Sequence, residues 1–346
     1  MRKLGAGHAG LLGTAGALSI AFSGIFVRLS GASPSTVAVY RCLYALPVLG
    51  ALALAERRRF GPRPRRQRAL ALVAGTLLAA DLVSWHHSIA AVGAGLATVL
   101  ANTQVVFVGL LAWVLLRERP QRGSLVAVPM VLAGIVAISG LLDGEAYGAD
   151  PGAGVAFGVL TALMYSGFLL VLRAGNKDLR RPAGPLFDAT AAAAVTAALL
   201  GAAAGDFDGR VTWPAHGWLL ALALSAQVLG WLLISTSLPR LPALVTSLLL
   251  TIQPVASVLL GILLLGESPS PLQLAGVATI LGGVTVATLG LRRTGPDRAL
   301  EPHSGRPQPR DSYLASPRPL RPVYSRPPWG KRRDKRHASP AGKRSR

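Results

Sequence analysis

Two long stretches of almost uninterrupted apolar sequence limit what this chain can fold into. Residues 9–55 and 69–291 contain only short polar breaks, whereas a helix that packs in water needs a polar face. Hydrophobic residues make up 51% of the 346 residues, and the mean hydropathy is +0.46. This composition predicts an all-α membrane protein rather than a soluble globular domain.

The apolar stretches divide into ten predicted transmembrane helices. A helix needs about 20 mostly apolar residues to cross the hydrocarbon core, and Gly and Pro residues separate segments of that length here. Short loops between them favour antiparallel neighbours. The predicted helices are 8–28, 34–55, 69–91, 94–116, 122–142, 153–173, 184–204, 216–237, 241–265 and 271–291.

The loop charges predict how these helices are oriented. Lys and Arg are retained on the cytoplasmic side, and residues 56–68 hold seven arginines, whereas residues 143–152 are acidic. We therefore expect a multi-pass protein of the cell membrane with both termini in the cytoplasm. The first apolar run follows Met1-Arg2-Lys3, and its length is typical of a retained first helix.

The sequence repeats itself at an offset of 149 residues. Gln104 precedes Glu118 by fourteen residues, and Gln253 precedes Glu267 by the same distance, with an apolar helix between each pair. Five helices per repeat is an odd number, so the second copy must enter the membrane from the opposite side. The predicted organisation is two inverted five-helix repeats and a tail, at residues 1–142, 153–291 and 292–346.

These paired segments resemble the drug/metabolite transporter superfamily in its ten-helix EamA-type form. Gln253-Pro254 leading to Glu267 is similar to the family pattern, and Gln104 leading to Glu118 is similar except that Val105 stands where proline is usual. The resemblance covers about residues 8–291. It implies a secondary transporter of the inner or plasma membrane that exports amino acids or related small metabolites by alternating access.

Two other functions stay open at this point. One is export of drugs or toxic cations by the same fold, and the other is a membrane scaffold or regulator that acts through its basic tail. The sequence contains no phosphate-binding loop, HExxH motif or nucleophile turn, so we expect neither an enzyme nor a cofactor. A homodimer is left open, because small-xxx-small patterns are common throughout these helices.

Arg41 is the first candidate for substrate binding, because ionisable side chains inside membrane helices usually face a cavity or a partner. It lies about seven residues, or about 10 Å, into its predicted helix. Its guanidinium could bind an anionic group of a small-molecule substrate, such as a carboxylate. The alternatives are a structural pair with Asp81 or snorkelling to the outer interface.

The third predicted helix has an unusually polar face. Asp81, Trp85 and Ser88 share it by their spacing, and we expect them to contribute to the substrate site. Asp81, His86 and His87 are candidates for proton coupling, because histidine exchanges protons near neutral pH. For the two histidines, placement at the membrane interface is the favoured alternative.

Further polar residues recur on other helices. Gln227, Trp231 and Ser235 share one face of the eighth helix, where they could line the substrate cavity or join helices to one another. Polar residues near repeat-equivalent helix starts are a further group, because such starts contact substrate in inverted-repeat transporters. This group comprises Asn102, Gln104, Thr251 and Gln253, and weaker candidates are Tyr40, Tyr165 and Asp188.

Three residues are expected to be structural. Glu118 and Glu267 lie at predicted helix ends, where we expect them near the surface, capping helices or pairing with arginines. Cys42 is the only cysteine, which excludes intrachain disulfides and cysteine metal clusters.

The last 55 residues carry much of the positive charge. Residues 292–346 contain sixteen Lys and Arg against four Asp and Glu, a net +12 of the chain's +21. Their Pro-, Arg- and Ser-rich composition predicts a disordered segment. We expect a cytoplasmic tail of this charge to bind anionic lipid headgroups rather than nucleic acid.

Overall fold

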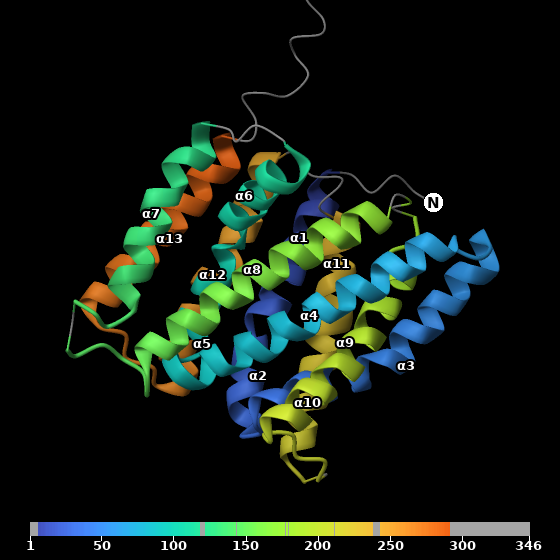
Figure 1. Ribbon diagram of the computed structural model, residues 1–346, viewed down its shortest axis with the longest axis horizontal. Coiled ribbons are helices and arrows are strands. Elements are labelled where there is room, and N and C mark those ends of the chain that lie inside the picture. The colour runs from blue at the N-terminus through green and yellow to red at the C-terminus, as the bar shows by residue number, and fades with distance from the viewer. Residues whose placement is uncertain are drawn as a thin grey trace, which may run out of the picture. The chain divides into compact units, whose positions relative to one another are not determined.

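The computed structural model describes residues 6–117, 122–142, 144–176, 178, 180–210, 212–237 and 243–290, and every regular element in them is a helix. The tail that begins at residue 292, Glu118 and the side chain of Ser235 lie outside the described part. The elements in Figure 1 are α1 (Ala6–Ala21), α2 (Ser23–Ser30), α3 (Pro34–Phe60), α4 (Arg65–Val92), α5 (Ala94–Asn102), α6 (Gln104–Leu116), α7 (Arg122–Ile138), α8 (Pro151–Gly175), α9 (Ala183–Ala204), α10 (Ala215–Leu222), the π-helix η1 (Ala223–Gly230), α11 (Trp231–Ser237), α12 (Ala243–Leu265) and α13 (Pro271–Gly290).

In the described ranges, eight helical segments are long and apolar enough to cross a membrane. Two shorter apolar helices, Leu125–Ile138 and Thr251–Leu265, lie where the sequence predicts two more spans. Large apolar side chains such as Leu11, Leu199 and Leu263 are 72%, 67% and 76% exposed. An apolar outer surface of this kind suits lipid rather than water, and the chain is a multi-pass membrane protein.

Three predicted helices, 8–28, 94–116 and 216–237, are interrupted in the structure. Breaks at Phe22 and Thr103 divide the first two, and η1 interrupts the third. Hydroxyl groups next to these sites donate to carbonyls one turn back, from Ser23 to Ile20 at 2.5 Å and from Thr103 to Leu100 at 2.6 Å. Such bonds compete with the helical ladder and bend helices, which the apolar pattern alone does not reveal.

The packing between helices follows the sequence repeat. Helix α3 packs on α9, α5 on α12 and α7 on α13, while α4 packs on α8 and α1 on α11. An offset of 149 residues relates α3 to α9, α5 to α12 and α7 to α13, so each of these three pairs joins two repeat-related helices. The same offset relates the α1–α11 contact to the α4–α8 contact. Figure 1 shows α7 beside α13 and α4 beside α8, so each repeat packs mainly on the other.

The core is centred on α4, which belongs to both main apolar clusters. Leu78 and Leu82 pack with α3, α8 and α9, whereas Ile89 packs with α5 and α12. Close approach is possible because Gly75 faces the backbone of Ala189 in α9, where a Cβ would collide with the Ala189 carbonyl. Small residues at helix contacts are the usual means of tight packing in membranes.

Candidate functional site

Arg41 lies two turns into α3 and is 4% exposed. Its Nε donates a 3.0 Å hydrogen bond to Oε1 of Gln227, and its guanidinium carbon lies 5.8 Å from the centroid of the Trp85 ring. Its Nη1 is buried and has no hydrogen-bond partner among the described residues. One amide and one aromatic face therefore hold the guanidinium, and part of its donor capacity is unused.

Gln227 connects Arg41 to the other repeat. It is fully buried in η1, and its Nε2 donates to Oγ1 of Thr190 at 3.2 Å. Because the amide nitrogen is bound to Thr190, the amide oxygen is left to accept from Arg41. Gln227 lies in a π-helix, an element that is rare and often occurs at functional sites.

Asp81 lies one turn before Trp85 on α4 and is 6% exposed. Within the described chain its carboxylate forms no hydrogen bond and no ion pair, and only its backbone carbonyl accepts a bond, from Thr161 at 3.4 Å. It interacts electrostatically with Arg41. The structural Arg41–Asp81 ion pair considered from the sequence is therefore not formed.

Aromatic rings lie next to these charges. Tyr165 and Phe168 of α8 stack at 5.6 Å, and Trp231 of α11 packs edge-on against them at 6.1 Å and 5.6 Å. Tyr165 and Trp231 pack against the apolar cluster that contains Cys42 and Leu82, the residues that follow Arg41 and Asp81 in the chain. The structure thus brings together the predicted residues Arg41, Asp81 and Trp85 with Gln227, and it places Tyr165 and Trp231 beside them.

Other predicted site residues make local bonds elsewhere. The Ser88 hydroxyl donates to the Gly154 carbonyl at 2.8 Å and joins α4 to α8. Asn102 donates within its own helix, to the Thr98 carbonyl at 2.8 Å.

Gln104 and Gln253 lie on other helices, α6 and α12. The Gln104 backbone carbonyl accepts from Ser166 at 3.1 Å, while its buried Oε1 has no partner among the described residues. Gln253 is half-buried on α12, as is Thr251. No hydrogen bond described for these residues leads to Arg41.

The two adjacent histidines have different surroundings. His86 is 1% exposed, and its Nδ1 lies 3.1 Å from the Pro34 carbonyl. His87 is partly exposed, with Nε2 3.6 Å from a carboxylate oxygen of Asp206 and its ring stacked on Phe157. The packing of α4 against the start of α3 buries the His86 ring, whereas the His87 ring is partly exposed.

Glu267 is buried, with 3% of its surface exposed. Its two carboxylate oxygens accept hydrogen bonds from the backbone nitrogens of Ala94 and Gly95, at 2.5 Å and 3.1 Å. The prediction of a surface position is wrong, because the turn at Gly266, where φ is +66°, lets the side chain reach the start of α5. The predicted capping role is confirmed.

Two further carboxylates cap helices of the opposite repeat. Glu56 accepts from the backbone nitrogens of Ala183 and Gly184 at the start of α9, at 2.9 Å and 2.7 Å. Asp206 accepts from the Ser35 nitrogen at the start of α3, at 3.2 Å. Ser35 and Gly184 are 149 residues apart, so these two caps are repeat-related.

A cavity of about 290 Å³ lies at each end of the α3–α9 pair. One is lined by arginines and carboxylates from the end of α3, the α3–α4 loop, the start of α4 and the region around the start of α9, including Arg63, Arg68 and Asp188. The other is lined at the start of α3 and after α9 by residues that include Asp206 and His216. Arg41 lines neither of these two cavities.

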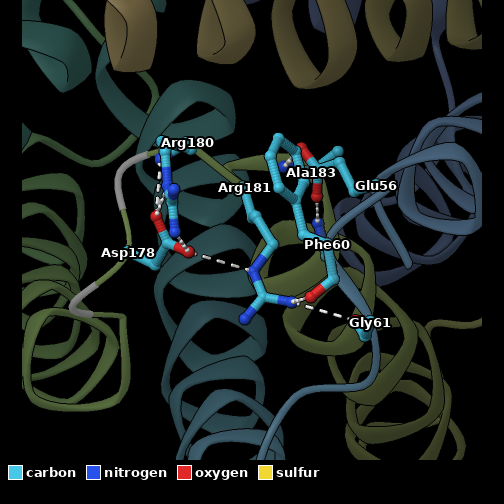
Figure 2. A network of polar contacts seen from close by, with 8 residues as sticks. Glu56, Phe60, Gly61, Asp178, Arg180, Arg181 and Ala183 are labelled. Atoms are coloured by element: carbon cyan, nitrogen blue, oxygen red, sulfur yellow. Dashed lines mark hydrogen bonds and ion pairs between the residues drawn. The ribbon is translucent and has the colours of Figure 1, made fainter. Parts of the chain in front are cut away.

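At the end of the α3–α9 pair where Arg63 lies, arginine side chains join the α3–α4 loop to the segment before α9, as Figure 2 shows. Arg181 Nη1 donates to the carbonyls of Phe60 and Gly61, at 3.3 Å and 2.9 Å. Asp178 accepts two hydrogen bonds from the Arg180 side chain, at 2.8 Å and 3.0 Å, and these bonds lower the pKa of Asp178 to about 2. The α3–α4 loop is thereby held against the segment that precedes α9.

Asp188 lies at the same end and not in the Arg41 cluster. Its carboxylate forms an ion pair with Arg63 and lies 3.6 Å from Arg68. Burial lowers the pKa of the Arg63 guanidinium, and the nearby Asp188 opposes that change. Tyr40, another weaker candidate, donates to the Gly209 carbonyl at 3.0 Å near the opposite end.

Thr190, Glu56 and Asp206 were not predicted as functional residues. Thr190 accepts a hydrogen bond from Gln227, and the two carboxylates make contacts between the repeats. Thr190 stands at the repeat offset from Arg41, so the 149-residue periodicity could have identified it. Glu56 and Asp206 follow long apolar helices and read as loop charges. Their partners lie more than a hundred residues away, and no local sequence signal indicates them.

The helical spans are those of a multi-pass membrane protein, and a cluster of polar side chains is buried among them. The sequence profile of the EamA-like transporter family matches this chain twice, at residues 8–140 and 152–289. The chain belongs to the EamA-like transporter family, within the drug/metabolite transporter superfamily, and is a multi-pass membrane transporter.

The chain was also compared with curated proteins and with solved structures. No curated protein matches the chain. A solved structure described only as "Crystal structure of protein" is similar over 84% of this chain and 99% of its own, with a TM-score of 0.52 and 20% sequence identity. That likeness concerns the fold alone.

Proposed function

We propose that this chain is a secondary transporter that exports amino acids or related small metabolites across the cell membrane. It works by alternating access between two inverted five-helix repeats. The twofold family match, the repeat-related packing and the arginine-rich loops support ten membrane helices with both termini in the cytoplasm.

The observation that carries the proposal is the position of Arg41 between the repeats. It is a buried cation of the first repeat, bound by Gln227 of the second, and one of its nitrogens has no partner in the described chain. Burying a charge is costly unless it is paired and hydrogen-bonded. A substrate carboxylate would complete the pairing, and relative motion of the repeats would change its access to either side.

The test is a growth panel in cells that express the wild type, Arg41→Ala or an empty vector. The cells are challenged with toxic amino-acid analogues, metabolites and cationic drugs. We expect resistance to amino-acid analogues that disappears in Arg41→Ala at equal membrane expression. Arg28→Ala, at an exposed arginine of α2, is the matched control and should keep the resistance.

Export of toxic cations is the second candidate, because the buried Asp81 carboxylate has no ion-pair partner among the described residues. Resistance confined to cationic drugs, and lost in Asp81→Asn, would establish that function instead. Growth identical to the empty vector across the whole panel would count against both forms of export.

A further inference from the structure

We propose that the cavity at the arginine-rich end of the α3–α9 pair binds the phosphate group of an anionic membrane phospholipid. Arg41 does not line this cavity, so the proposal is independent of the compound that the chain exports.

The charges that line this cavity do not balance. It has a volume of about 290 Å³, and four arginines and two carboxylates in its lining give a net charge of +2. These side chains are Arg57, Arg63, Arg68, Arg181, Glu56 and Asp188. The cavity at the other end is lined by Asp206, Asp208 and Arg210, so it does not share this positive charge. The first cavity therefore suits an anion.

The two carboxylates of the first cavity are already occupied. Both oxygens of Glu56 accept hydrogen bonds from backbone nitrogens at the start of α9, at 2.9 Å and 2.7 Å. Asp188 forms an ion pair with Arg63 and lies 3.6 Å from Arg68. Burial lowers the pKa of the Arg63 guanidinium, and Asp188 opposes that change. The positive charges of Arg68 and Arg181 lower this pKa further, so the arginines repel one another, and a bound anion would reduce that repulsion.

Two of the arginines have N–H groups to offer a ligand. Arg57 is exposed, and within the described chain its side chain forms no hydrogen bond and no ion pair. The Arg68 side chain is 61% exposed, and its 3.6 Å distance to Asp188 is too long for a hydrogen bond. A guanidinium can bind two phosphate oxygens through parallel N–H groups. Arg57 and Arg68 are therefore the residues that we expect to contact the phosphate.

The position of the cavity favours a lipid over a soluble anion. One membrane span ends at Phe60 and the next begins at Arg65, so the loop between them lies near the lipid headgroups. The cavity lining also includes Phe187 and Leu54, of which Leu54 is 48% exposed. An exposed leucine on a membrane helix faces acyl chains, so the cavity joins a cationic region to a lipid-facing surface.

The size and side of the cavity agree with this assignment. Ligand pockets commonly occupy about 300–1,000 Å³, and a cavity at the lower end of that range suits a headgroup whose acyl chains stay outside. Basic pockets between membrane helices on the cytoplasmic side bind acidic lipid headgroups. The arginine-rich loop is cytoplasmic in the proposed orientation, so the lipid would come from the inner leaflet.

The experiment measures the apparent melting temperature of the purified full-length chain in detergent as ligand is added. The ligands are phosphatidylglycerol, the zwitterionic lipid phosphatidylcholine, and sn-glycerol 3-phosphate as a soluble phosphate ester. A ligand that binds the folded state preferentially raises the melting temperature, and the concentration dependence of the rise gives its affinity. We expect phosphatidylglycerol to bind at least about tenfold more tightly than either of the others.

Two double variants with the same change in net charge locate the site. Arg57→Gln/Arg68→Gln should weaken phosphatidylglycerol binding at least about tenfold, because it removes two charge-assisted contacts. Arg58→Gln/Arg66→Gln removes two exposed arginines of the same helices that do not line the cavity, and should bind within about twofold of the wild type, because exposed charges are screened. Arg57→Lys/Arg68→Lys keeps the charge and should recover part of the binding. The tail is identical in all these chains, so its own affinity for lipid does not contribute to the differences, and melting without ligand establishes that each variant is folded.

Three results would overturn the inference. Equal weakening in the two glutamine variants would mean that the lipid responds to diffuse charge on this face. Binding of sn-glycerol 3-phosphate as tight as that of phosphatidylglycerol would indicate a soluble phosphate ester. A melting temperature unchanged by phosphatidylglycerol would mean that the folded chain has no such site. The growth panel can succeed or fail independently of these results, because neither Arg57 nor Arg68 belongs to the Arg41 cluster.

Discussion

Arg41 combines deep burial with incomplete pairing, and its neighbours explain how the protein tolerates this. Gln227 supplies a neutral acceptor rather than a carboxylate, so the guanidinium is oriented but its charge is not neutralised. A structural role alone would favour a full ion pair or an apolar replacement, since such replacements of buried ion pairs are often stabilising. A bound anion would give the buried Nη1 of Arg41 the acceptor that the described residues do not supply.

Gln227→Glu separates the stability role of this residue from its role in transport. The new carboxylate would pair with Arg41, so we expect an apparent melting temperature equal to or above that of the wild type. Export should fall at least about tenfold, because losing one charge-assisted contact to the substrate costs more than about 1.4 kcal/mol. Thermal melting and the resistance assay measure the two effects.

Gln227→Leu completes this prediction. Removing the acceptor leaves Nε of Arg41 buried and unsatisfied, which should lower stability by about 1–3 kcal/mol. Gln67→Leu, at a partly exposed glutamine near the start of α4, is the control and should change little. If Gln227→Glu transported normally, the charge of Arg41 would not be needed for the substrate.

For single residues, the sequence could identify candidate polar side chains for the site but not the groups to which they hydrogen-bond. Arg41, Asp81 and Gln227 stand out because polar groups are costly inside a membrane. Whether Ser88 points to the site or to Gly154 depends on the register between distant helices, and one sequence carries no measure of that register.

Helices in both repeats have their first backbone N–H groups bound by a carboxylate of the other repeat. The described caps by Glu267, Glu56 and Asp206 each cross from one repeat to the start of a helix in the other. A carboxylate at a helix start satisfies free backbone N–H groups and interacts favourably with the helix dipole. These caps therefore couple helix ends to the opposite repeat.

Glu267→Ala should destabilise the protein more than removal of an exposed cap. Two buried N–H groups of α5 would lose their acceptor, at a cost of about 1–3 kcal/mol. Asp150→Ala removes a comparable bond to the Ala153 nitrogen, of 2.9 Å, at an exposed position, and should cost about 1 kcal/mol. Equal shifts in the two melting curves would contradict the importance of burial.

Asp206→Ala tests whether its cap holds the start of α3 closed. Cys42, seven residues beyond the capped Ser35, is the only cysteine and has no exposed surface. A maleimide should label it about fivefold faster in the variant, which corresponds to the ~1 kcal/mol of a helix cap. A cysteine-free Cys42→Ala chain gives the background.

The control for this prediction lies at the other end of the same helix pair. Asp188→Ala removes the ion pair with Arg63 of the α3–α4 loop, leaves the cap of Ser35 in place, and should leave the labelling rate near that of the wild type. Equal acceleration in both variants would mean general loosening rather than local opening.

The helical elements were more predictable from the sequence than the breaks within them. Span length and the Gly and Pro residues between spans are local properties, and the segment from Pro34 to the arginines near residue 57 illustrates both. The interruption at Phe22 and the π-helix around Gln227 were not predictable. They depend on which hydroxyl groups and neighbouring helices compete for the backbone, which an apolar run does not specify.

Across the whole molecule, the 149-residue repeat relates cavities and helix caps as well as helices. The cavities at the two ends of the α3–α9 pair, and the caps beside them, exchange places under the 149-residue offset. Because the two ends of the α3–α9 pair are built alike, an arrangement open at one end would have a similar counterpart open at the other end. Alternating access needs such a pair of arrangements of comparable free energy.

The C-terminal tail lies outside both matched repeats, because the second match ends at residue 289. Deleting residues 293–346 should leave export per molecule within about twofold of the full-length value, because the deleted segment lies outside both repeats. A contribution of the tail to the transport barrier of ~1 kcal/mol would change the rate about fivefold and would be detected. The tail's net positive charge should instead increase binding to vesicles that contain anionic lipid, an effect that salt weakens. The measurement is the resistance assay at matched membrane expression, with full-length Arg41→Ala as the inactive control. If the truncated chain lost resistance while Arg41→Ala kept it, the tail would be the functional part, and a scaffold would explain the protein better than a transporter.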